Sequence, residues 1–212
     1  AVGMLDEAQE KAVMAEQLRI LADELNVRPS GYRSPSWDVN VWTPGLLKTH
    51  GFLYDSSLMG NDVPYDVVTP EGPLTEVPVQ WIMDDAPLFR HVYGASNAIA
   101  DPGRVLQMWS REFTAMHKEN GCFVLTCHPF ISGRASRVAL LEELVRFMRR
   151  HRSVWFTTCD EVARWHAAHL PPLSTAQLAG VKSAVSVGAA PITGHTPPQL
   201  ASQITRISHA TF

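Results

Sequence analysis

The sequence has few cysteines, no excess of basic charge and no long apolar run, and each shortage excludes a class of protein. Its three cysteines are too few and too poorly spaced for a disulfide scaffold or a CxxC zinc site. The formal net charge of -3 over 212 residues argues against a generic nucleic-acid-binding protein, which would be basic. A membrane-spanning helix needs roughly 18 consecutive apolar residues, and no such run occurs.

Acidic residues are absent from residues 171–212, where Lys182 and Arg206 are the only fixed charges. This segment contains five prolines among Ala, Ser, Thr and Gly, so it has little to bury and many helix breakers. We therefore expect a folded portion over residues 1–170, with a net charge of -5, followed by a flexible, low-charge tail over 171–212.

Helical and strand patterns alternate along the folded portion. Asp6 and Gln9 have the spacing of a capping box at the start of the first helix. Further helices are predicted at residues 44–50, 102–120, 135–151 and 158–169. Strands are predicted at residues 52–54, 75–81, 122–127 and 154–156, with a long loop over 56–73. Strands separated by helices predict a parallel α/β sheet or barrel.

A histidine follows the most apolar of these strands. Residues 122–127 are apolar on both faces, as in a buried parallel strand, and His128 comes directly after them. Functional sites of parallel α/β folds lie at the carboxyl ends of strands. Because its pKa is near neutrality, a histidine there could act as a general acid or base. The alternative is a structural histidine bonded to a loop carbonyl.

The loop over residues 31–37 is a second candidate. Arg33 could hold a carboxylate through its forked donors, and Trp37 could provide a flat wall for a sugar. The alternative is a surface loop that Pro35 and an aromatic plug keep in place.

Two acidic stretches complete the candidates. Asp84 and Asp85 end the strand predicted at 75–81, where a carboxylate could orient a histidine or bind a cation. Their alternative role is to cap a turn or helix. Tyr65 belongs to an acidic loop over 55–65 that could equally be an ordered surface loop.

These candidates belong to an ordered series of motifs between about residues 6 and 168. The motifs are Gly31–Trp37, Gly51–Met59, Asp62–Tyr65, Glu76–Asp85, Leu125–Pro129 with Ser132–Arg134, Val154–Phe156 and Asp160–Ala163. Together they resemble the polysaccharide deacetylase superfamily (NodB-homology, carbohydrate esterase family four), in the branch of cytosolic peptidoglycan-deacetylase-like proteins and cofactor-independent allantoinases. The resemblance implies a distorted (β/α) barrel that removes acyl groups from N-acetylated sugars or cleaves related C–N bonds.

The resemblance also implies roles for single residues. In metal-dependent members, one Asp and two His bind zinc or a similar ion, a second Asp acts as base and a His acts as acid. His128 corresponds to that acid and Arg33 to the arginine that positions the base. Asp84 is the first choice to orient His128, and Asp85 is nearly as good. The residues expected to contact substrate are Trp37, Trp81, Pro35, Tyr65 and Asp85.

Two motifs of the family have no counterpart here. Its Asp-Asp pair and its His-x-x-x-His-like segment precede, in family order, the helix that starts here at Asp6. We therefore expect an incomplete barrel without its first strands, and no metal ligands in this chain, although a zinc-type divalent ion is implied for the full-length family member. The chain could be a piece of a longer reading frame, a non-catalytic remnant, or half of a site completed by another chain.

The main functional hypothesis is the C-terminal part of a deacetylase-like hydrolase of amino sugars or peptidoglycan, inactive as this chain alone. One alternative is a non-catalytic carbohydrate-binding or scaffold protein. The other is a metal-independent, allantoinase-like amidohydrolase. The expected partner is an amino-sugar or small amide substrate, not nucleic acid or membrane, and a homo-oligomer is left open. No secretory signal is visible from Ala1 onward. A cytoplasmic location is expected, with the true N-terminus expected upstream of Ala1.

Overall fold

The structure is a computed structural model that describes residues 2–92 and 98–169. The tail predicted at 171–212 therefore lies outside the described residues. The chain divides into two compact units. Unit 1 takes Ala1–Pro78 and the chain from Thr157, and unit 2 takes Val79–Phe156.

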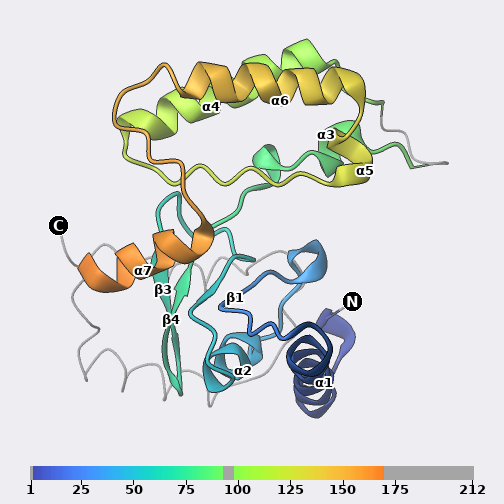
Figure 1. Cartoon of the computed structure of the whole chain (residues 1–212), viewed down its shortest axis with the longest axis vertical. Helices are drawn as coiled ribbons and strands as arrows, with labels where there is room; N and C mark the ends of the chain where they lie inside the picture. Colours follow the sequence, from blue (N-terminus) through green and yellow to red (C-terminus); the bar gives the residue numbers. More distant parts are fainter. Residues whose placement is uncertain (1, 93–97, 170–212) are drawn as a thin grey trace. The chain divides into compact units, whose positions relative to one another are not determined.

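Unit 1 is built on a four-stranded sheet with the order β1-β2-β4-β3 (Figure 1). The strands are β1 (Gly31–Tyr32), β2 (Tyr54–Asp55), β3 (Tyr65–Thr69) and β4 (Gly72–Glu76). The first, second and fourth run parallel, and β3 is antiparallel to β4. The register places Tyr32 beside Asp55 and Asp55 beside Glu76. Three parallel strands thus end side by side.

The prediction of a long loop over residues 56–73 is wrong, because this stretch contains β3 and the start of β4. The two strands form a hairpin whose turn is closed between Thr69 and Gly72. Gly72 has φ of 119°, a conformation that favours glycine, and the Thr69 hydroxyl donates to its carbonyl at 2.8 Å. The strand predicted at 75–81 ends at Glu76, since Pro78 has no N–H to donate to a ladder.

In the described part of unit 1, three helices and two short 3-10 turns accompany the sheet. They are η1 (Val2–Met4), α1 (Glu7–Leu25), η2 (Pro35–Trp37), α2 (Thr43–Thr49) and α7 (Cys159–His169). The predicted capping box of α1 is present, because the Asp6 carboxylate accepts the Gln9 N–H and the Gln9 side chain accepts the Asp6 N–H. The core of this unit consists of Met14, Leu46, Leu47, Phe52 and Leu74.

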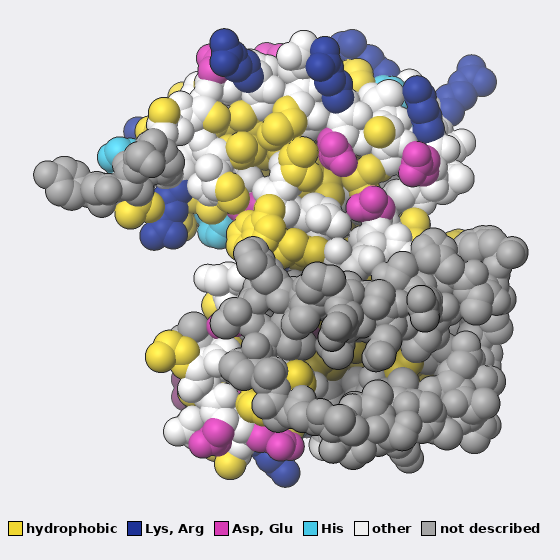
Figure 2. All heavy atoms as spheres, turned by 180° about the vertical axis from the view of Figure 1, so that it is seen from behind, with side chains coloured by type: hydrophobic (Ala, Val, Ile, Leu, Met, Phe, Trp, Pro, Cys, Tyr) yellow, Lys and Arg dark blue, Asp and Glu magenta, His cyan; other side chains and the backbone are white. Residues whose placement is uncertain are grey.

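Unit 2 is mostly helical. Its elements are η3 (Trp81–Met83), α3 (Ala86–Phe89), α4 (Pro102–Lys118), α5 (Pro129–Ser132) and α6 (Ala135–Met148). Helices α4 and α6 lie side by side (Figure 1) and share an apolar core around Trp109, which is fully buried. The Trp109 indole N–H donates to the Ile82 carbonyl at 2.8 Å. Lys and Arg side chains gather over these helices (Figure 2).

The strands predicted at 122–127 and 154–156 form no β-ladder within the described part of the chain. Residue Thr126 makes one isolated parallel bridge with Asp84, while Trp155 and Phe156 are exposed. A strand exists only where a second backbone pairs with it, and apolar character alone does not supply that partner. The expected α/β class with a partial sheet is confirmed. Within residues 2–92 and 98–169, no helix has both the length and the apolar character that crossing a bilayer requires.

Candidate functional site

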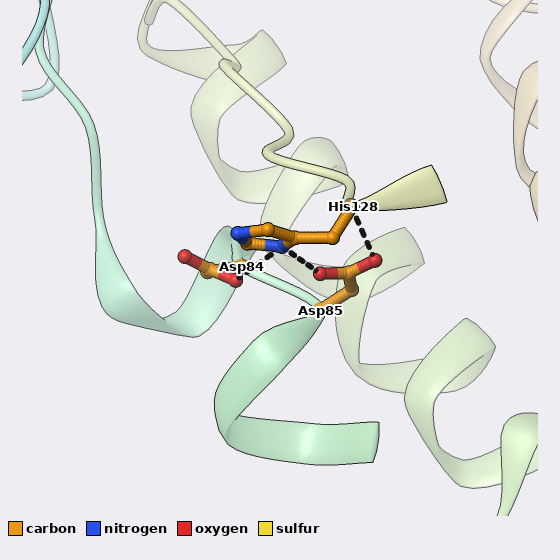
Figure 3. Close-up of side chains that lie close together, drawn as sticks. All are labelled: Asp84, Asp85 and His128. Carbon is orange, nitrogen blue, oxygen red and sulfur yellow. Dashed lines mark hydrogen bonds and ion pairs between the residues drawn. The ribbon is translucent and has the colours of Figure 1, made fainter. Parts of the chain in front are cut away.

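In unit 2 the chain brings two acids and a histidine together (Figure 3). Asp84 and Asp85 connect η3 to α3, and His128 immediately precedes α5. Backbone hydrogen bonds join the two segments, because the Thr126 N–H donates to Met83 at 2.8 Å and the Asp85 N–H donates to Thr126 at 3.1 Å. This bridge places His128 next to the aspartates.

Asp85 is the residue that holds His128. One oxygen of its carboxylate lies 2.5 Å from His128 Nδ1. The other accepts the His128 backbone N–H at 2.8 Å and the Ser132 hydroxyl at 2.5 Å. Asp85 is fully buried, and its two oxygens both have donors. The carboxylate therefore fixes the orientation of the ring, and the Nδ1 proton belongs to this contact.

Asp84 makes its short hydrogen bond to the backbone rather than to His128. Its nearer oxygen lies 3.8 Å from His128 Nδ1 and accepts the Ala86 N–H at 2.7 Å, which caps the start of α3. The sequence analysis favoured Asp84 over Asp85 as the residue that orients His128. The short hydrogen bond to His128 Nδ1 is made by Asp85 instead. The predicted alternative, a capping aspartate, describes Asp84.

The other ring nitrogen of His128 points away from Asp85. The His128 side chain is 38% exposed, so Nε2 can meet a molecule from outside the unit. Phe130, itself 69% exposed, lies edge-on to the imidazole with 5.8 Å between ring centroids. Trp81 is 41% exposed in the same unit. With Nδ1 held by Asp85, the ring offers Nε2 as the nitrogen that could exchange a proton with a bound molecule.

These three residues form the one group of three or more potential metal ligands within the described parts of the chain. Their ligand atoms lie within 4.8 Å of one another. However, both Asp85 oxygens and His128 Nδ1 are used in hydrogen bonds, and one Asp84 oxygen caps α3. An ion would have to break the contacts that hold the histidine, so this donor set does not fit a divalent metal.

Unit 1 has its own polar centre, where the three parallel strands end. Arg33 follows β1, and its Nε and Nη2 donate to the carbonyl and hydroxyl of Ser56 at 2.9 and 2.7 Å. The Ser56 hydroxyl donates in turn to the Val77 carbonyl at 2.7 Å. The Ser34 N–H donates to the Ser57 hydroxyl at 2.9 Å. Residues that follow β1 thus bond to Ser56 and Ser57, which follow β2, and Ser56 bonds to Val77, which follows β4.

The residues expected to contact substrate in unit 1 are mostly covered. Trp37 is 5% exposed, and Tyr65 is also buried, with its hydroxyl accepting the Gly60 N–H at 3.1 Å. Pro35 is exposed. Ser36 and Trp37 have φ of 57° and 55°, a left-handed conformation that costs roughly 1 kcal/mol or more for each non-glycine residue. The 35–37 turn is therefore strained, and it carries a buried Trp37.

The two most deeply buried acids of unit 1 were not predicted as functional residues. Asp55 and Glu76 are 1% and 0% exposed at the ends of β2 and β4. Glu76 Oε1 accepts the N–H groups of Ser57 and Leu58, both at 2.9 Å, and the Ser57 hydroxyl donates to Asp55 at 2.7 Å. Burial raises the pKa of Asp55 to about 6. Burial, followed by the nearby Asp55 charge, raises the pKa of Glu76 well above its usual range. Their positions at strand ends are the signal that could have identified them.

The predicted site residues thus fall into two sets. Unit 2 brings together His128, Asp84 and Asp85 and also carries Trp81. Unit 1 carries Arg33, Pro35, Trp37 and Tyr65.

No family model matches the chain. Two curated proteins are similar to it in sequence. A peptidoglycan deacetylase of Helicobacter pylori is 29% identical over 183 residues, which cover 73% of this chain and 62% of that protein. A peptidoglycan deacetylase-like protein of Gibberella zeae is 26% identical over 195 residues, covering 76% of this chain and 58% of that protein. The chain thus spans about 60% of the length of these relatives.

Solved structures are similar as well. A crystal structure from Mycobacterium smegmatis, assigned as a polysaccharide deacetylase, matches with a TM-score of 0.76 and 35% identity, over 82% of this chain and 62% of that one. A second, from Pseudomonas aeruginosa and assigned likewise, matches with a TM-score of 0.66 and 30% identity, over 78% of this chain and 55% of that one.

Proposed function

Since the chain belongs to the polysaccharide deacetylase superfamily, we propose that it forms part of a hydrolase that removes acetyl groups from amino sugars of a glycan such as peptidoglycan. The names of its relatives support the class of reaction. The observation that carries the proposal is the contact between the buried Asp85 carboxylate and His128 Nδ1. Hydrolysis of an amide requires a proton for the departing amine, and this pair is built to supply one.

The proposed role of His128 is that of general acid. With Nδ1–H held by Asp85, the ring presents Nε2, whose proton passes to the leaving nitrogen as the C–N bond breaks. Asp85 stabilises the positive charge that the ring carries before the transfer. Ser132 and the His128 backbone keep the carboxylate in place, so the acid does not have to reorganise during the reaction.

Metal-dependent hydrolysis is general among deacetylases of this superfamily. Both Asp85 oxygens, His128 Nδ1 and one Asp84 oxygen are engaged in the contacts described above, so we derive no step through an ion held by these residues. The proposed contribution of this chain is the proton donor and, in unit 1, an arginine secured by Ser56. We predict that the 212-residue chain alone releases no acetate from N-acetylglucosamine oligomers. His128-dependent release by this chain would contradict that prediction.

The proposed function is tested in two steps. The coding DNA upstream of the Ala1 codon is sequenced, and a continuous frame encoding an Asp-Asp pair and a His-x-x-x-His segment is expressed together with this chain. The longer protein should release acetate from N-acetylglucosamine oligomers, and His128→Ala should reduce the rate about 100-fold or more, while His169→Ala leaves it unchanged. Full activity of the His128→Ala protein would overturn the assignment.

A second candidate, carbohydrate binding without hydrolysis, is favoured by two exposed rings of unit 2, that of Phe130 beside the histidine and that of Trp81. Flat exposed rings stack on the apolar faces of sugars. Calorimetric titration of the chain with N-acetylglucosamine oligomers should then show binding that weakens in Trp81→Ala and is indifferent to chelators. Absence of any heat of binding would remove this candidate.

A further inference from the structure

Unit 1 buries two neighbouring acids that have no part in the proposed function. Asp55 and Glu76 are partners in the register of β2 and β4, and both are removed from water. Ser57 donates to one Asp55 oxygen, and the N–H groups of Ser57 and Leu58 donate to Glu76 Oε1. One oxygen of each carboxyl is thereby satisfied.

The remaining two oxygens, Asp55 Oδ2 and Glu76 Oε2, are buried without a hydrogen-bond partner. A buried oxygen without a donor costs about 1–3 kcal/mol, and two adjacent buried negative charges repel each other. One proton removes both penalties, because a carboxylic acid can donate to a neighbouring carboxylate.

The other ionisable groups around the pair do not provide a substitute proton. Arg33 acts on Asp55 through its positive charge, but neither Asp55 Oδ2 nor Glu76 Oε2 accepts a hydrogen bond from it. Tyr65 faces Glu76 and Tyr32 faces Asp55, and burial raises the pKa of both phenols, which keeps them neutral.

We propose that Asp55 and Glu76 share one proton at neutral pH, and that this proton holds residues 56–58, and through Ser56 the Arg33 guanidinium, in the positions seen here. The inference concerns unit 1 alone and does not depend on hydrolase activity. Loss of the proton places two buried charges side by side. Their repulsion separates the two carboxyls and displaces residues 56–58, which are bonded to them. Asp55 and Glu76 are therefore positioning residues for residues 56–58 and Arg33.

The direct test is carbon-13 NMR of the whole chain with labelled aspartate and glutamate carboxyls. One side-chain signal at pH 7 should have the chemical shift of a protonated carboxyl, and it should disappear in Glu76→Gln or Asp55→Asn. Glu71→Gln, which changes an exposed glutamate at the turn of the same hairpin, should leave it in place. Aspartate and glutamate signals that are all ionised at pH 7 in the folded chain would overturn the proposal.

A second readout separates this role from simple packing. Because the folded state holds the proton more tightly than the unfolded chain, the unfolding constant should rise with pH, by up to tenfold per pH unit between about pH 5 and 7. Glutamine has the shape of a protonated glutamate and can donate to Asp55, so Glu76→Gln should fold and lose much of this pH slope. The amide shifts of Ser57 and Leu58 should move with the carboxyl signal. An unchanged slope in Glu76→Gln would contradict the shared proton.

Discussion

Both units bury an aspartate among hydrogen-bond donors, but the partners differ. In unit 2, Asp85 faces an imidazole, a serine hydroxyl and a backbone N–H, so both of its oxygens have hydrogen-bond partners. In unit 1, Asp55 faces another carboxyl, and each acid keeps an oxygen without a donor. The same residue type therefore orients a histidine in one unit and pairs with a second carboxyl in the other, where we propose that it shares a proton.

The largest effect is expected for Glu76→Ala. This change removes the acceptor of two buried N–H groups, leaves Asp55 without its partner and opens a cavity. We expect unit 1 to lose about 4 kcal/mol in its free energy of unfolding. Denaturant unfolding followed through unit 1 resonances measures the loss, and Glu71→Ala is the exposed control. A loss below about 1 kcal/mol would show that Glu76 is not an essential acceptor.

Asp85→Ala makes the corresponding change in unit 2. Three donors lose their acceptor, but His128 is partly exposed and can bond to water, so a loss of about 3 kcal/mol is expected. The loss should appear in unit 2 resonances. Asp84→Ala removes one capping contact and should cost only about 1 kcal/mol. Equal losses for the two variants would contradict the different roles assigned to the neighbouring aspartates.

The contrast between the units also predicts a pH dependence. Asp55 has a raised pKa of about 6 in the folded chain, so the folded state binds its proton more tightly than the unfolded state does. Stability from this group is fully present below the unfolded value near 4 and is lost as the pH rises through 6, by up to about 3 kcal/mol. Asp55→Asn should remove that loss, and Asp62→Asn should not. Unfolding midpoints measured at pH 4.5 and 7 distinguish the two.

Asp6→Ala measures how much an exposed carboxylate contributes to the free energy of unfolding. Its oxygen accepts the Gln9 N–H at 2.8 Å at the start of α1, so its loss should cost about 1 kcal/mol. Asp6→Asn keeps an acceptor and should recover most of that. Helical circular dichroism during thermal unfolding follows the change, and a cost as large as that of Glu76→Ala would undermine the distinction between exposed and buried acids.

Features coded by neighbouring residues could be predicted from the sequence. The capping box of Asp6 and Gln9 and the capping of α7 by Thr158 depend on residues three positions apart. The hairpin of β3 and β4 had local signals as well, a Pro-Glu-Gly turn after a Val-Val strand, but the surrounding acidic loop obscured them.

Features that depend on distant partners could not be predicted. The choice between Asp84 and Asp85 rests on the bridge to Thr126, 42 positions away from Asp84. The pairing of Asp55 with Glu76 depends on the register of β2 and β4. Residues 122–127 have the apolar character of a strand but pair with no ladder in the described chain, so composition alone was not sufficient there.

The role proposed for His128 requires that Asp85 hold its Nδ1 proton and leave Nε2 to react. Nitrogen-15 NMR of the imidazole rings in the 212-residue chain measures this directly, at a pH where the ring is neutral. We expect His128 to carry its proton on Nδ1, and Asp85→Ala to return it to the mixture of tautomers found in an exposed histidine. A neutral His128 that carries its proton on Nε2 in the unmodified chain would contradict the account.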